Sequence, residues 1–238
     1  MAGLEEHAGA PYPGAGTLRV HPDPASVPVP PSDGSVPGEN RFDDPTGRVA
    51  VRYTATRLTG CLFETMARFR PSPAAEAVLS SIAGVDENDV DWPPDDVAAV
   101  GEWLDQQLVG TVRVLDNGIF VDIEEPAVLV QLDKHPLVRA AIERLDPAGR
   151  LDTGLIRLGG LQLGRPVTQA VGVAVREWMP TALGIAYTSR LADEPCWAIW
   201  VTTTVDVTAV PLSPADPQHV AAVRRVAQAL EITLPDNW

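Results

Sequence analysis

Basic residues are scarce in this chain of 238 residues, because 18 Lys and Arg stand against 32 Asp and Glu, giving a formal net charge of −14. Proteins bind the phosphates of nucleic acids and anionic membrane surfaces through clustered Lys and Arg. We therefore expect neither direct nucleic-acid binding nor a membrane partner. A negative total charge does not exclude a locally basic pocket for a small anion.

Cysteines, signal-peptide features and long apolar runs are also nearly absent. The two cysteines, Cys61 and Cys196, have apolar neighbours and belong to no CxxC or Cys/His cluster, which disfavours a zinc site and favours buried free thiols. The first residues show no basic stretch followed by an apolar segment, so we expect no signal peptide. Apolar runs fall far short of the roughly 20 residues that span a bilayer. We expect a cytoplasmic protein.

Common catalytic motifs are missing as well. The sequence contains no GxxxxGK[ST], GxSxG or HExxH pattern, and its four histidines are scattered. Gly159, Gly160 and Gly164 lack the strand–turn–helix context of a dinucleotide fingerprint. The sequence therefore predicts no metal site and no resident cofactor.

The periodicity of apolar residues predicts one α+β domain with a mixed or mostly antiparallel sheet. Residues 1–16, rich in Pro and Gly, are expected to be a disordered tail before a domain at 17–238. The turn sequence Asp116-Asn117-Gly118 predicts a β-hairpin. We expect strands at 17–20, 48–54, 111–115, 119–123, 184–188 and 197–205, and helices at 58–69, 95–108, 137–145, 167–178 and 214–230.

Glu64 is a candidate functional residue. It lies on the expected helix 58–69, which follows the strand that has Tyr53 at its end. At 100° per residue, Glu64 points well away from the apolar stripe of that helix. Two interpretations remain open from this geometry. The carboxylate either lies on a solvated helix face or faces a cleft between helix and sheet.

Several short segments in order resemble the RES domain family. The segments 17–22, 40–42, 51–56 and 61–64 are similar to its N-terminal half, and 184–190 with the strand 196–201 is similar to its second signature. The resemblance extends from about residue 17 to about 205. The family is named for an Arg, a Glu and a Ser, which match Arg41, Glu64 and Ser189 here, with Arg19 and Tyr53 as further polar positions.

The resemblance implies a fold and an activity. RES proteins are toxins of bacterial toxin–antitoxin pairs with a compact fold similar to ADP-ribosyltransferases. They deplete NAD⁺ by cleaving its nicotinamide–ribose bond through phosphorolysis or hydrolysis. The expected substrates are thus NAD⁺ and, for phosphorolysis, inorganic phosphate. The expected partner is an Xre-like helix-turn-helix antitoxin.

The resemblance also implies roles for five residues. Glu64, Arg41 and Ser189 would be catalytic, with Glu64 stabilising an oxocarbenium-like transition state and Ser189 donating to a phosphate or the leaving amide. Arg41 and Arg19 would bind the pyrophosphate, because the guanidinium fork matches phosphate geometry. Tyr53 would offer an aromatic face and a hydroxyl to the substrate.

Other interpretations stay open. Arg41 could instead pair with Asp43 or Asp44 at the surface, and Glu39-Asn40 replaces a Gly-Gly pair common in the family. Tyr53 and Ser189 could simply be ordinary residues of their strands. Arg165 and Arg190 are conceivable further cations, although surface solvation is the simpler expectation for both. The alternative functions are transfer of ADP-ribose to a macromolecule and a catalytically silent interaction module.

Overall fold

One eight-stranded sheet organises the residues that this computed structural model describes, namely 8–23, 25, 40–47, 49–70, 97–158 and 164–238. The strands are β1 (Gly9–Ala10), β2 (Thr17–His21), β3 (Val51–Ala55), β4 (Leu108–Val114), β5 (Phe120–Asp122), β6 (Gly184–Thr188), β7 (Pro195–Trp200) and β8 (Val205–Pro211). Their order is β1-β5-β6-β7-β3-β2-β4-β8. Among the described strands only β5 and β6 pair in parallel, which confirms the expected mixed, mostly antiparallel sheet of an α+β domain.

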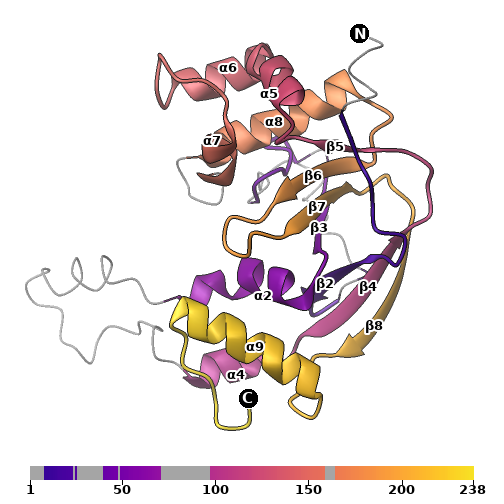
Figure 1. Ribbon diagram of the computed structural model, residues 1–238, viewed down its shortest axis with the longest axis vertical. Helices are drawn as coiled ribbons and strands as arrows, with labels where there is room; N and C mark the ends of the chain where they lie inside the picture. Colours follow the sequence, from indigo (N-terminus) through magenta and orange to yellow (C-terminus); the bar gives the residue numbers. More distant parts are fainter. Residues whose placement is uncertain (1–7, 24, 26–39, 48, 71–96, 159–163) are drawn as a thin grey trace, which may run out of the picture.

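The helices form two groups beside the sheet (Figure 1). One group lies near β5 and β6: α5 (Pro126–Asp133), α6 (Pro136–Glu143), α7 (Thr153–Leu158) and α8 (Arg165–Trp178). The other lies near β2 and β4: α2 (Leu58–Met66), continued by the 3-10 turn η1 (Ala67–Phe69), with α4 (Val97–Asp105) and α9 (Pro217–Leu230). No helix among the described residues has the length and apolar character to cross a membrane.

The strand β7 is buried on both faces and shows where the cores lie. Cys196, Ala198 and Trp200 belong to the main core under the helices, while Trp197 and Ile199 belong to a second, smaller core. This alternation follows from the two-residue period of a strand. Because both faces are covered, the strand reads as a nearly continuous apolar run rather than as an alternating one.

The expected disordered tail at 1–16 differs from the structure over residues 8–16, while residues 1–7 lie outside the described part. β1 pairs with β5, and Ala8 is fully buried. The Tyr12 ring stacks on Phe120 at 5.1 Å and meets Trp197 edge-on at 5.6 Å between centroids. This segment covers the second core. The expectation of disorder rested on a composition rich in Pro and Gly, but the burial of one large aromatic side chain, Tyr12, is enough to hold the segment on the sheet.

The expected β-hairpin at Asp116-Asn117-Gly118 is wrong. β4 pairs with β2 and β8, whereas β5 pairs with β1 and β6, so the chain crosses the sheet between these strands. The Asp116 carboxylate accepts a hydrogen bond from the backbone N–H of Thr204 at 2.6 Å, and the N–H of Leu115 donates to the Thr204 carbonyl at 2.9 Å. These two hydrogen bonds hold residues 115–116 against the turn between β7 and β8.

Other boundaries were only partly anticipated. The strand expected at 197–205 is two strands, β7 and β8, with a turn between them, and α5 and α7 were not expected. Residue 48 of an expected strand and residues 95–96 of an expected helix lie outside the described residues. The C-terminal helix is confirmed as α9, where the Asp216 side chain accepts from the N–H groups of Gln218 and His219 as an N-cap.

We predict that Tyr12 fixes the N-terminal segment to the sheet. Its hydroxyl donates to the Val112 carbonyl at 2.8 Å and bonds the Thr17 hydroxyl at 2.6 Å. Tyr12→Phe should lower the free energy of unfolding by about 1 kcal/mol, and Tyr12→Ala by about 2–4 kcal/mol. Urea unfolding measures both. Leu115→Ala, at an exposed side chain, is the control and should change little. A Tyr12→Ala midpoint equal to that of the parent would show that the segment is not docked.

Candidate functional site

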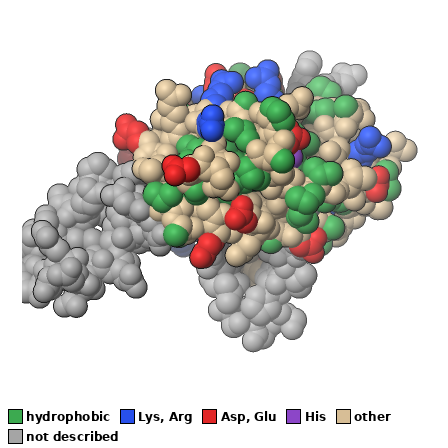
Figure 2. All heavy atoms as spheres, turned by 90° about the horizontal axis from the view of Figure 1, so that it is seen from below, with side chains coloured by type: hydrophobic (Ala, Val, Ile, Leu, Met, Phe, Trp, Pro, Cys, Tyr) green, Lys and Arg blue, Asp and Glu red, His purple; other side chains and the backbone are tan. Residues whose placement is uncertain are grey.

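A cavity of about 380 Å³ lies between α2, the strands β2, β3, β6 and β7, and the start of α8. This volume falls in the range of small-molecule sites. Its charged lining consists of Arg19, Arg41, Arg165 and Glu64, so three guanidinium groups face one carboxylate. The outer face in Figure 2 instead shows acidic side chains spread among apolar ones, with basic groups gathered near its upper edge. The cavity is therefore locally cationic in a chain of net charge −14.

Tyr53 anchors the turn that carries Arg41. Its hydroxyl accepts from the backbone N–H of Phe42 at 2.9 Å and donates to Asp43 Oδ1 at 3.0 Å. The other oxygen of Asp43 accepts from the backbone and side-chain nitrogens of Asn40 at 3.0 and 2.9 Å. Burial, and then the nearby Asp43 carboxylate, raise the pKa of Tyr53 well above its usual value. Tyr53 thus lines the cavity and also links this turn to the centre of the sheet.

Arg41 is 7% exposed and lies over an aromatic surface. Its guanidinium carbon is 4.8 Å from the centroid of the Tyr187 ring, and Nη2 donates to the Ile156 carbonyl at 2.8 Å. Asp43 is occupied by the contacts described above, and Asp44 accepts from Arg176 at 3.1 Å. The alternative of a surface ion pair between Arg41 and either aspartate is therefore wrong.

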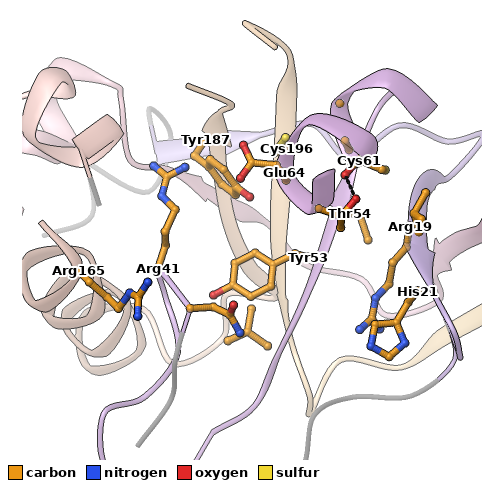
Figure 3. Close-up of a pocket in the computed structure, with 16 residues that line it drawn as sticks. Arg19, His21, Arg41, Tyr53, Thr54, Cys61, Glu64, Arg165, Tyr187 and Cys196 are labelled. Carbon is orange, nitrogen blue, oxygen red and sulfur yellow. Dashed lines mark hydrogen bonds between the residues drawn. The ribbon is translucent and has the colours of Figure 1, made fainter. Parts of the chain in front are cut away.

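Glu64 faces the cavity from α2, close to Tyr187 (Figure 3). Ser189 Oγ donates to Glu64 Oε1 at 2.6 Å across 125 residues of sequence. The same hydroxyl oxygen accepts from the backbone N–H groups of Leu191 and Ala192, both at 3.2 Å. Since these two donors occupy its acceptor sites, the hydroxyl proton is directed at the carboxylate. Glu64 therefore lines the cavity and is also exposed to solvent, so each of the two interpretations describes part of its position.

The loop that begins at Ser189 contacts α2 at a second point. Glu194 Oε1 accepts from the Thr59 hydroxyl at 2.9 Å, in the first turn of α2. The backbone N–H of Ser189 donates to the Glu194 carbonyl at 2.8 Å, which closes the loop. Asp193 adopts a left-handed φ of 49° inside it. The loop therefore holds both the start of the helix and the carboxylate further along it.

Arg19 and His21 lie at the opposite side of the cavity from Arg41, with Tyr53 between them (Figure 3). Arg19 is 6% exposed on β2. Burial, and then the charge of Arg52, lower the pKa of Arg19 to about 10, which still leaves it protonated at neutral pH. Burial also lowers the pKa of His21, with Arg19 as the second cause. The five residues singled out from the sequence thus surround one cavity, except that Ser189 reaches it only through Glu64.

Sequence reasoning gave too little weight to Arg165 and missed Tyr187. Arg165 is the first residue of α8 and lines the cavity, while the other conceivable cation, Arg190, is exposed and does not. Its position at a helix start was the available signal. Tyr187 lies two residues before Ser189 on β6, so the alternation of that strand could have placed it on the same face. Asn40 keeps an ordinary backbone without a positive φ, and Glu39 lies outside the described residues.

The two cysteines line the cavity as buried thiols. Cys61 Sγ donates to the Leu18 carbonyl at 3.0 Å, and burial raises its pKa to about 12. Burial, and then the charge of Glu64, raise the pKa of Cys196. Among the described residues there is no cluster of three or more metal-ligating side chains.

No protein-family model, no curated protein and no solved structure matches this chain.

We predict that both thiols resist alkylation in the folded protein. A thiol with a pKa of about 12 is ionised to only about one part in 10⁴ at pH 8, and the thiolate is the reactive form. Iodoacetamide at pH 8, followed by mass spectrometry, should label neither Cys61 nor Cys196 in native protein within an hour. The guanidinium-unfolded chain is the control and should take two labels. Rapid labelling of the native protein would contradict the burial described here.

Proposed function

We propose that this chain cleaves the nicotinamide–ribose bond of NAD⁺, with inorganic phosphate or water as the acceptor. The observation that carries the proposal is the Ser189–Glu64 hydrogen bond, which orients a carboxylate into a cavity lined by arginines. The three residue types of the RES pattern, Arg41, Glu64 and Ser189, thereby meet around one site. The toxin-like role and the fold similarity to ADP-ribosyltransferases belong to the same proposal.

The reaction needs one charge to be stabilised and no protein nucleophile. The C1′–N bond of the ribose breaks, and its electron pair goes to the ring nitrogen, so nicotinamide leaves as a neutral molecule. Positive charge develops on the ribose, as in glycoside cleavage. A phosphate oxygen, or a water oxygen that then loses a proton, forms the new bond to C1′. Glu64 would stabilise the positive charge, since a fixed carboxylate in a partly closed site interacts more strongly than one in water.

Ser189 acts on the reaction through Glu64. Its proton already goes to Glu64 Oε1, and it does not line the cavity. The expected donation from Ser189 to a phosphate or leaving amide is replaced in this proposal by a positioning role. A carboxylate with one oxygen fixed keeps its second oxygen available to the ribose.

The remaining lining residues fit the other parts of the substrate. Arg41 provides a cation for the pyrophosphate, Arg19 provides a second cation on the other side of the cavity, and Tyr53 provides aromatic surface for a flat heterocycle. An Xre-like helix-turn-helix antitoxin that covers the mouth of the cavity is the partner this proposal includes.

Glu64→Gln tests the proposal directly. Incubation of the parent with NAD⁺, with and without phosphate, should release nicotinamide, measured by liquid chromatography. Removing the charge while keeping the size should lower the rate about 100-fold or more. Glu102→Gln changes an exposed carboxylate on α4 and is the matched control. Phosphate-dependent release indicates phosphorolysis, and modified protein without bulk NAD⁺ loss indicates ADP-ribosyl transfer. No turnover or modification by the parent indicates a silent module and ends the proposal.

Ser189→Ala tests the positioning role. Without the bond to Glu64 we expect kcat to fall about tenfold while KM changes less than twofold, since the substrate does not touch Ser189. Ser189→Thr keeps a hydroxyl and should recover part of kcat. Thermal unfolding of each variant checks that the loop is intact. Equal kcat values for Ser189→Ala and the parent would exclude the role.

A further inference from the structure

Arg165 stands out among the cations of the cavity because no function was assigned to it. It is half-buried at the first position of α8, and its Nε is a buried donor without a hydrogen-bond partner. Within the described part of the chain, its guanidinium forms no ion pair with a carboxylate. A buried donor on a charged group is costly when left without a partner. Because the Arg165 side chain also lines the cavity, an anionic ligand bound there would balance the positive charge of its guanidinium.

Arg41 shows the same feature beside it. Among the described residues its Nε is also buried without a hydrogen-bond partner, while Nη2 donates to the Ile156 carbonyl. The guanidinium of Arg41 likewise has no carboxylate partner in the described residues. Figure 3 shows both arginines on the same side of the cavity, whereas Arg19 lies on the other side beyond Tyr53.

The local structure keeps these two guanidinium groups in place without neutralising them. Arg41 is held by the Tyr187 ring and by the turn that Tyr53 anchors. That turn packs directly on α8, because a Cβ at Gly172 would lie 2.8 Å from the Phe42 carbonyl oxygen. Gln169 Nε2, also on α8, donates to the Asn40 carbonyl at 3.2 Å. The helix that carries Arg165 is thus fixed against the turn that carries Arg41.

We infer that Arg41 and Arg165 together form the binding site for a diphosphate group, as in a nucleotide or dinucleotide ligand. Two guanidinium groups on one side of the cavity suit the several oxygens of a diphosphate, because charge-assisted hydrogen bonds from Arg to phosphate are strong. The partial positive charge at the start of α8 adds to the same field. Arg19, on the opposite side, then contacts a different part of the ligand. The inference rests on the proposed function in identifying this group as the diphosphate of NAD⁺. The binding of a diphosphate anion by Arg41 and Arg165 can be tested separately from NAD⁺ cleavage.

The test uses inorganic pyrophosphate as the probe, by isothermal titration at 150 mM salt without divalent cations. The parent should bind it with a measurable dissociation constant. Arg165→Gln should weaken binding about tenfold or more, since a charge-assisted contact is lost. Arg165→Lys keeps the charge without the fork and should lie between the two. Arg225→Gln removes an exposed positive charge from α9 and should bind like the parent.

Four outcomes would overturn the inference. The first three are no pyrophosphate binding by the folded parent at 10 mM, unchanged binding by Arg165→Gln, and an equal loss in Arg225→Gln. An Arg19→Gln effect as large as that of Arg165→Gln would also overturn it, because the diphosphate would then not be confined to one side. Thermal unfolding confirms the fold of each variant, and Arg165→Lys serves if Arg165→Gln unfolds. Pyrophosphate binding without NAD⁺ turnover would end the proposed function and leave this site standing.

Discussion

The pairing of β3 with β7 is the constraint on which the rest of the structure depends. Five consecutive residue pairs, from Val51 opposite Trp200 to Ala55 opposite Cys196, join the two halves of the sheet. On one side lie β2, β4 and β8 with the helices α2, α4 and α9, and on the other lie β5 and β6 with α5 to α8. The cavity lies over this seam. Each half of the sheet contributes side chains to the cavity that the other half lacks. A shift of one residue in the pairing of β3 with β7 would turn Tyr53 to the opposite face of the sheet.

The elements with a strong local signal were predictable from the sequence, and the long-range pairings were not. The stripe of α2 and the strands β3 and β6 follow from periodicity, whereas α9 begins at Pro217 and not at the expected residue 214. The absent hairpin shows the limit, because a turn sequence specifies a bend and not which strands pair across it. The docking of Tyr12 on Phe120 likewise depends on a contact across more than 100 residues.

The candidate site was anticipated in its residue types more than in its arrangement. The angle of Glu64 on its helix was correct, but only the fold brings Ser189 to it. Arg41 was expected at a surface or in a pocket, and the choice depends on Asp43 and Asp44 already being occupied by other partners. Arg165 was undervalued because a basic residue at a helix start usually faces water. In each case the position of the side chain depends on which polar groups already have hydrogen-bond partners in the folded protein. No sequence pattern specifies those partners.

The N-terminal segment covers apolar side chains through which the sheet could otherwise contact another molecule. It covers the face of the sheet where Phe120, Ile199 and Trp197 form the second core. Without that cover, these side chains would form an exposed apolar patch on a sheet, a surface through which proteins self-associate. Ala10 and Tyr12 therefore shield these side chains from such contacts.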